Sequence, residues 1–236
     1  YLEFLLDLKQ RGESEKYEIA KIDSLGWSRN FNGGAAYAEY YHNHPAYTEY
    51  PVVNITKTGA EMYCEWLTKK YDAISNGELK VKFRIPTRAE WIRAARGDNH
   101  SKVYTWNGVS LLKQDGKSGF HGQVQANCIR NGAESITRNK ETGKFEFIYT
   151  NYSNYFSGGK SADVTAPSKS YWPNDFGMYN MNGNVSEMIS DGDFAVGGDW
   201  NSPGYDIRNE SIKDFKEANR TVGFRVVATY IEPLKK

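Results

Sequence analysis

The sequence has little cysteine and no long apolar run. Only two of its 236 residues are cysteines, Cys64 and Cys128, which is too few for a disulfide scaffold or a cysteine-rich zinc site. No stretch approaches the roughly 18 consecutive apolar residues of a membrane-spanning helix. The composition therefore predicts a chain that does not span a membrane and that folds without a disulfide framework.

The chain also lacks an excess of charge of either sign. It carries 30 basic and 29 acidic side chains, for a net charge of +1. Such a balance gives no excess of positive charge that would attract nucleic acid or an anionic membrane, so we expect neither as a partner. The short motifs of zinc proteases, α/β-hydrolases, P-loop enzymes and dinucleotide-binding proteins are absent as well.

Aromatic residues and glycine are abundant instead. The chain has 17 tyrosines, 11 phenylalanines, 6 tryptophans and 22 glycines. Large rings fill a core, and glycines permit frequent turns. No internal repeat or linker-like change of composition divides the chain, so we expect one α+β domain with long loops over residues 1–236.

Local patterns predict the regular elements. Two capping boxes, which begin at Thr58 and Thr87, indicate helix starts. On the first of these helices, Cys64 lies on the apolar face together with Ala60 and Ile74. Apolar spacing and turn signals place helices over residues 1–9, 58–75 and 87–97, and strands over residues 51–55, 81–85, 145–149 and 222–230.

The cysteines and two histidines are the first candidates for reactive or metal-binding side chains. Cys64 is interpreted as a core thiol because it lies on an apolar helix face, and neither cysteine has a base-like pattern beside it. His42 and His44 lie on one side of an extended segment and could bind zinc. No cysteine or carboxylate cluster nearby completes such a site, so ordinary histidines remain the alternative.

The stretch of residues 172–191 is the densest in oxygen-bearing side chains. Asn180, Asn182, Asn184 and Glu187 supply hard oxygen atoms, and Gly183 lets the backbone turn so that carbonyl groups can point inward. Calcium binds such mixed sets of side-chain and backbone oxygens. The alternative is an asparagine-rich turn held by hydrogen bonds from side chains to the backbone.

A series of motifs along the chain follows the order of a known family. The chain resembles the formylglycine-generating enzyme domain, the sulfatase-modifying factor family, over nearly its whole length. The resemblance rests on residues 51–55, 63–67, 83–97, 126–127, 165–167, 173–187, 197–200 and 223–225. It implies an α+β domain with a modified C-type-lectin-like fold and little regular structure, here without the family's N-terminal segment.

The resemblance also bears on enzymatic activity. Catalytic members oxidise a sulfatase cysteine to formylglycine with two cysteines that bind copper(I), and soft thiolates suit that ion. Ser202 and Ile207 stand at the two cysteine positions of this chain. Neither side chain can bind copper(I) or form a mixed disulfide, so we expect no copper and no oxidase activity of this kind.

The resemblance further implies calcium. In the family pattern, Asn180 and Glu187 would bind calcium through their side chains, and Gly183 and Val185 through their carbonyl groups. A second family site would use the Asn127 side chain and the Cys128 carbonyl group. That site also needs an aspartate where this chain has Lys160 in an ungapped alignment, and a lysine would repel the ion.

Within the family, the tyrosine-rich stretch of residues 42–50 and the Gly-Asn-Val-Ser-Glu-Met sequence of residues 183–188 resemble non-catalytic lipoproteins of Bacteroidetes gliding and secretion machinery. This implies an extracytoplasmic binding or assembly module, in the periplasm or at the cell surface, with a protein or glycan partner and a lipid anchor on upstream residues. Two alternatives stay open. One is a formylglycine-generating oxidoreductase that uses Cys128, and the other is a different enzyme with His42, His44 or Asp206 in its cleft.

Overall fold

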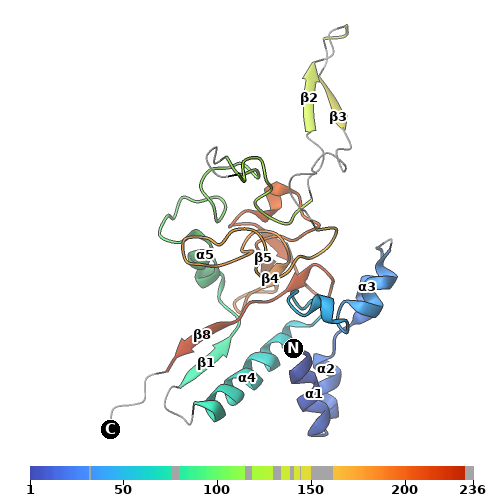
Figure 1. The fold of residues 1–236 in the computed structure, drawn as a ribbon, viewed down its shortest axis with the longest axis vertical. Coiled ribbons are helices and arrows are strands. Elements are labelled where there is room, and N and C mark those ends of the chain that lie inside the picture. Colours follow the sequence, from blue (N-terminus) through green and yellow to red (C-terminus); the bar gives the residue numbers. More distant parts are fainter. Residues whose placement is uncertain are drawn as a thin grey trace.

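We describe the fold from a computed structural model of the chain (Figure 1). The structure describes residues 1–31, 33–75, 80–114, 119–129, 134–138, 141–143, 145–149 and 162–231. The helices are α1 (Leu2–Gln10), α2 (Ser14–Ala20), η1 (Ser24–Trp27), α3 (Gly34–Tyr40), η2 (Pro45–Tyr47), α4 (Lys57–Ile74), α5 (Arg88–Arg96) and η3 (Gly204–Ile207). The strands are β1 (Val81–Arg84), β2 (Glu134–Arg138), β3 (Phe145–Tyr149), β4 (Ser186–Met188), β5 (Phe194–Val196), β6 (Ile212–Asp214), β7 (Val222–Gly223) and β8 (Val227–Tyr230).

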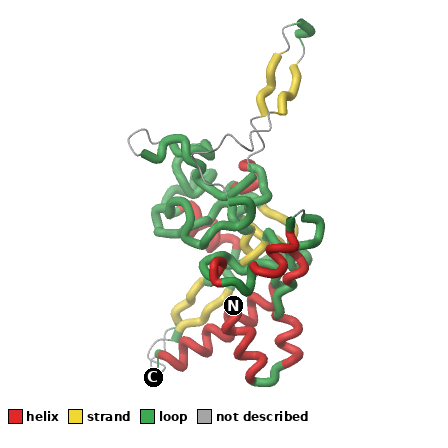
Figure 2. The backbone as a smooth tube through the Cα atoms, turned by 45° about the vertical axis from the view of Figure 1, so that its right-hand side comes forward, coloured by secondary structure: helices red, strands yellow, loops and turns green. Residues whose placement is uncertain are grey.

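The α+β class is confirmed, and helices and loops lie in different parts of the molecule. Figure 2 shows α1, α2 and α4 together at one end, a middle part made mostly of loops with short helices and strands among them, and the β2–β3 pair of strands at the opposite end. The predicted first helix is confirmed as α1, which buries Phe4, Leu5 and Leu8. This apolar face packs against Tyr63 and Trp66 of α4. The helical end is thus held by the burial of large rings.

The predicted start of α4 is wrong by two residues. Thr56, and not Thr58, is the N-cap, because its side chain accepts the Gly59 N–H. Ala60 and Cys64 are buried as predicted. Ile74, which was predicted on the same face, is 80% exposed because it is the last residue of α4. The second capping box is confirmed, since Thr87 and Glu90 bond reciprocally at the start of α5.

The strand predicted over residues 51–55 is not formed. Asn54 has a φ of 59°, a left-handed value that interrupts an extended strand. Its N–H donates to the Asn219 carbonyl group, and its own carbonyl group accepts from Asp23. Val53 and Ile55 are nevertheless fully buried. The apolar residues that suggested a strand are therefore core residues of an irregular segment.

A small four-stranded sheet, in the order β6-β5-β4-β7, lies in the loop-rich part. Strands β4 and β7 are parallel, with Glu187 opposite Gly223, and the other pairs are antiparallel. The strand predicted over residues 222–230 is divided between β7 in this sheet and β8, which pairs with β1. The predicted strands at residues 81–85 and 145–149 are confirmed as β1 and β3, and β3 pairs with β2.

Candidate functional site

The asparagine-rich turn before β4 joins distant loops through its side chains. The Asn182 side chain accepts the Thr105 N–H and donates to the Ile207 carbonyl group, at 2.7 Å in both cases. The Asn184 side chain both accepts from and donates to the backbone of Ala166. Both asparagines are buried. The predicted alternative of a turn held by side-chain hydrogen bonds is therefore present here.

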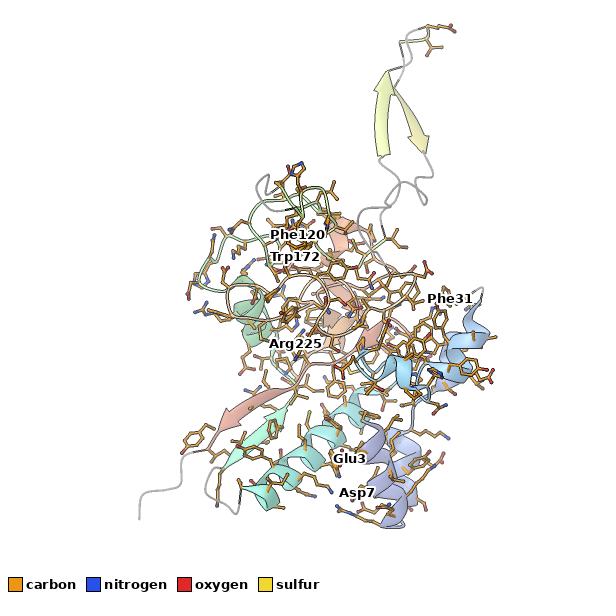
Figure 3. The ribbon with its side chains drawn as sticks, viewed as in Figure 1. Glu3, Asp7, Phe31, Phe120, Trp172 and Arg225 are labelled. Atoms are coloured by element: carbon orange, nitrogen blue, oxygen red, sulfur yellow. The ribbon has the colours of Figure 1, made fainter. Side chains whose placement is uncertain are left out.

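Glu187 lies at the centre of a buried charged group. Its carboxylate accepts two hydrogen bonds from Arg225, at 2.7 and 2.9 Å, and one from the indole N–H of Trp91 at 2.7 Å. The pairing of Glu187 with Gly223 explains this contact, because it brings Arg225, two residues later, beside the carboxylate. Burial alone would lower the pKa of Arg225, but Glu187 raises it above its ordinary value. Figure 3 places Arg225 near the middle of the molecule.

This geometry bears on calcium at Asn180, Gly183, Val185 and Glu187. The Arg225 guanidinium contacts both carboxylate oxygens of Glu187. The negative charge of the carboxylate is therefore already neutralised and does not attract a calcium ion. The Asn180 side chain donates to the carbonyl groups of Pro167 and Ser168. Gly183, with a φ of 76°, packs against the Asn127 backbone. The Glu187 carboxylate is thus a poor fit for calcium, whereas calcium bound through neutral oxygens of this loop stays a prediction.

The second predicted site has an unsatisfied acceptor. The Asn127 side chain is fully buried, and its Nδ2 donates to the Val164 carbonyl group and to Asn184. Its Oδ1 has no hydrogen-bond partner among the described residues. Cys128 is buried beside it, whereas Lys160 lies outside the described residues. A buried oxygen without a donor costs free energy unless a cation or water binds it, so Asn127 fits a cation better than Glu187 does.

The two positions of the family's cysteine pair are filled by side chains with structural contacts. The Ser202 hydroxyl accepts the Asp199 N–H, and Ile207 is fully buried in a cluster with Tyr104, Ala126 and Cys128. Asp199 is itself fully buried and accepts a hydrogen bond of 2.6 Å from Lys213 Nζ. This loop therefore consists of packed and hydrogen-bonded side chains, and neither of the two positions presents a sulfur atom.

The cysteines differ in what surrounds them. Burial raises the pKa of the Cys64 thiol to about 12, which keeps it protonated and unreactive at neutral pH. Cys64 is the core thiol that the sequence predicted. Cys128 is also buried but lies in the same cluster as Ile207, and the N–H of the next residue donates to the Ser202 carbonyl group. Cys128 thus lies beside both positions of the missing pair.

Of the three side chains predicted for a different enzyme, the structure brings two into one pocket and leaves out the third. His42 and His44 line one pocket of about 400 Å³ with Tyr1 and Tyr47, and Asp206 is not among its lining residues. Burial lowers the pKa of His42 to about 4. Among the described residues, no three His, Cys, Asp or Glu side chains form a group that could hold a metal ion. Zinc at His42 and His44 therefore has no third protein ligand of these types in the described part.

The fold and these sites define a small α+β domain in which buried amides and ion pairs hold long loops together. Residues 13–230 match the FGE-sulfatase family, described as the sulfatase-modifying factor enzyme 1-like domain. The chain therefore belongs to this family. None of the helices in the described part is long and apolar enough to cross a membrane.

Similar proteins carry different names. A formylglycine-generating enzyme of Streptomyces coelicolor is 30% identical over 163 residues, which are 69% of this chain and 36% of that protein. The serine/threonine-protein kinase pkn1 of Chlamydia pneumoniae is 30% identical over 147 residues, which are 62% of this chain but 14% of that protein. PvdO from Pseudomonas aeruginosa has a similar fold, with a TM-score of 0.50 and 18% identity over 78% of this chain and 63% of that chain. The chain thus spans about a third of the first of these relatives.

Sequence reasoning missed the partners of the charged residues. Arg225 was part of a recognised motif, but its contact with Glu187 across 38 residues was not predicted. The pair between Lys213 and Asp199 was not predicted either. The useful signal for Arg225 was the fixed order of the two motifs, because parallel pairing of their strands brings these side chains together.

Proposed function

We propose that this chain is a binding module of the FGE-sulfatase family that does not generate formylglycine. The observation that carries the proposal is the identity of the residues at the cysteine pair, Ser202 and Ile207. A hydroxyl group and a buried aliphatic side chain bind copper(I) poorly and cannot form a mixed disulfide with a substrate cysteine. The match of this chain to 14% of a protein named as a kinase supports the use of this domain in more than one setting.

The proposed partner is a protein or glycan of the cell envelope, and the proposed location is extracytoplasmic. These two parts of the proposal rest on the resemblance to non-catalytic lipoproteins of gliding and secretion machinery. A pull-down from envelope extracts tests them, and recovery of a specific envelope component is the expected result. Recovery of only cytoplasmic proteins would contradict both parts.

A peptide assay tests the absence of formylglycine formation. The protein is incubated with copper(I), oxygen and a peptide that contains Cys-X-Pro-X-Arg, and aldehyde is measured by mass spectrometry. We expect none. A catalytic formylglycine-generating enzyme is the positive control, and the double variant Ser202→Cys with Ile207→Cys asks whether a restored pair binds copper(I). Aldehyde formed by the unaltered chain would overturn the proposal.

Formylglycine formation through Cys128 is the second candidate, because this thiol lies beside Ile207 and the Ser202 loop. The same assay on Cys128→Ser decides it. Any aldehyde that disappears in this variant, but not in Cys64→Ser, would assign the chemistry to Cys128. Activity that survives in both variants would exclude both thiols.

We also propose that calcium binds in the native state, at Asn127 rather than at the Glu187 carboxylate. A native-state ligand raises stability by RT ln(1 + [L]/Kd), so melting is measured with calcium and with chelator. We expect a higher Tm with calcium, and loss of this shift in Asn127→Ala. The matched control Asn43→Ala, an exposed asparagine, should keep the shift. No shift at millimolar calcium would reject calcium binding.

A further inference from the structure

A small pocket in the loop-rich part combines aromatic rings with two lysines. It has a volume of about 180 Å³, and its lining includes Trp106, Trp172, Lys102, Lys113 and Asp175. Sites for drug-sized ligands span roughly 300–1,000 Å³, so this pocket fits a single ring-sized unit. Figure 3 shows Trp172 and Phe120 next to each other in this part of the molecule.

The aromatic side chains have fixed positions. Trp106 stacks on Tyr104 with the two ring centroids 4.7 Å apart and an angle of 3° between the ring planes. Its indole N–H donates to the Ser110 carbonyl group. Tyr104 covers one face of Trp106, and because the indole also lines the pocket, a ligand there would lie against its other face. Such a face packs well against the C–H groups of a flat apolar surface.

The lysines give the pocket an excess of positive charge. Lys102 is buried, and its ammonium group binds the Asp175 carboxylate. An ammonium group has three donors, so this pair leaves donors for a ligand. The Lys113 ammonium lies 4.3 Å from the centre of the Trp172 ring and has no carboxylate partner among the described residues. Two lysines against one carboxylate favour an anionic ligand.

Polar side chains complete the lining. Gln125 and Thr105 line the same pocket and can exchange hydrogen bonds with hydroxyl groups. A carboxylated sugar ring matches the aromatic, polar and charged parts of this lining together. It has a C–H face for Trp106, hydroxyl groups for the amide and hydroxyl side chains, and a carboxylate for Lys113. We propose that this pocket binds one carboxylated sugar unit of an acidic glycan. This inference rests on the proposed binding function, for which it names a ligand class.

Ligand-observed NMR and titration calorimetry test the proposal with three probes: glucuronate, glucose and acetate. We expect glucuronate to bind at least about tenfold more tightly than either other probe, because glucose lacks the carboxylate and acetate lacks both the ring face and the hydroxyl groups. Lys113→Gln should lower glucuronate affinity about tenfold at an unchanged Tm. The exposed Lys82→Gln on β1 is the matched control and should bind as the unaltered chain does. Trp106→Phe should weaken glucuronate and glucose alike.

Each of the other results would overturn the proposal. Equal binding of acetate and glucuronate would mean that the pocket recognises a bare carboxylate, including that of a peptide. Equal binding of glucose and glucuronate, with no effect of Lys113→Gln, would remove the role of charge. No binding of any probe would remove the site. None of these results changes the aldehyde assay, so failure here is distinguishable from failure of the proposed function.

Discussion

The helical end and the loop-rich end of this molecule are stabilised by different kinds of contact. In the helical end, Phe4 of α1 packs on Tyr63 and Trp66 of α4, with ring centroids 5.8 to 6.0 Å apart. In the loop-rich end, apolar clusters such as that of Ile207 are joined by long-range contacts of buried polar side chains, such as Asn182 and Glu187. Few of these loop residues lie in regular ladders, so side chains satisfy part of the backbone, beside irregular backbone bonds such as that from the Asn184 N–H to the Asn127 carbonyl group.

This difference determines how much of the structure a single substitution affects. A helix cap such as Thr87 bonds to residues three positions away, so its loss affects one helix end. Asn182 joins its own segment to two others, 77 residues earlier and 25 residues later in sequence, so its loss releases several loops at once. We therefore expect single polar substitutions to cost more in the loop-rich end than in the helical end.

The largest effect is expected from Arg225→Met. This substitution leaves the buried Glu187 carboxylate without its counter-charge, which typically costs about 3–5 kcal/mol in the free energy of unfolding. Chemical denaturation followed by tryptophan fluorescence measures it. The double variant Glu187→Gln with Arg225→Met should recover part of the loss, because it removes the uncompensated charge. A loss of unfolding free energy smaller than that caused by removing a helix cap would contradict the prediction that this ion pair is the most important of these polar contacts.

Asn182→Ala should have the next largest effect. It leaves the buried Thr105 N–H and the Ile207 carbonyl group without partners, for a cost of about 3 kcal/mol. The matched control is Asn43→Ala, between α3 and η2, because the exposed Asn43 side chain donates to a carbonyl group four residues away, that of Glu39. The control should change the unfolding free energy by no more than about 0.5 kcal/mol. Equal costs at the two positions would show that the contacts of Asn182 between distant loops add nothing to stability.

The stability of the protein should depend on pH through His42, which lies in the segment before α4. Burial lowers its pKa from 6.5 to about 4. Below pH 6.5 the unfolded chain binds a proton that the folded chain does not bind until about pH 4, so stability falls as pH falls through this range. The loss should be roughly 1–2 kcal/mol, because His42 is partly exposed. Tm measured from pH 7 to 4.5 should fall less in His42→Phe than in the unaltered chain.

The exposed His44→Phe is the control and should retain the full pH dependence. Glu90 does not interfere, because its contact with Arg84 lowers its pKa to about 2, so the α5 capping box stays intact over this range. An unchanged pH profile in His42→Phe would show that other groups cause the acid sensitivity.

The same contrast explains what the sequence could predict. The Thr87–Glu90 capping box, α1 and the burial of Cys64 depend on residues close in sequence, and these predictions are confirmed. The motif order was sufficient for the family and the α+β class. The left-handed Asn54 was not predictable from local pattern, because its backbone partners lie at Asp23 and Asn219. The contact of Arg225 with Glu187 depends on strand pairing, which a single sequence does not determine.

The smallest effect concerns the start of α4, where sequence and structure disagree by two residues. Thr56→Ala removes the acceptor of the Gly59 N–H and a hydrogen bond to the Ile19 carbonyl group, so it should cost about 1 kcal/mol. Thr58→Ala should be within about 0.5 kcal/mol of neutral, because Thr58 is exposed. Thr56→Ser keeps the acceptor and should retain most of the stability. A larger loss of stability for Thr58→Ala than for Thr56→Ala, measured by thermal unfolding, would show that Thr58 is the N-cap, as the sequence pattern indicated.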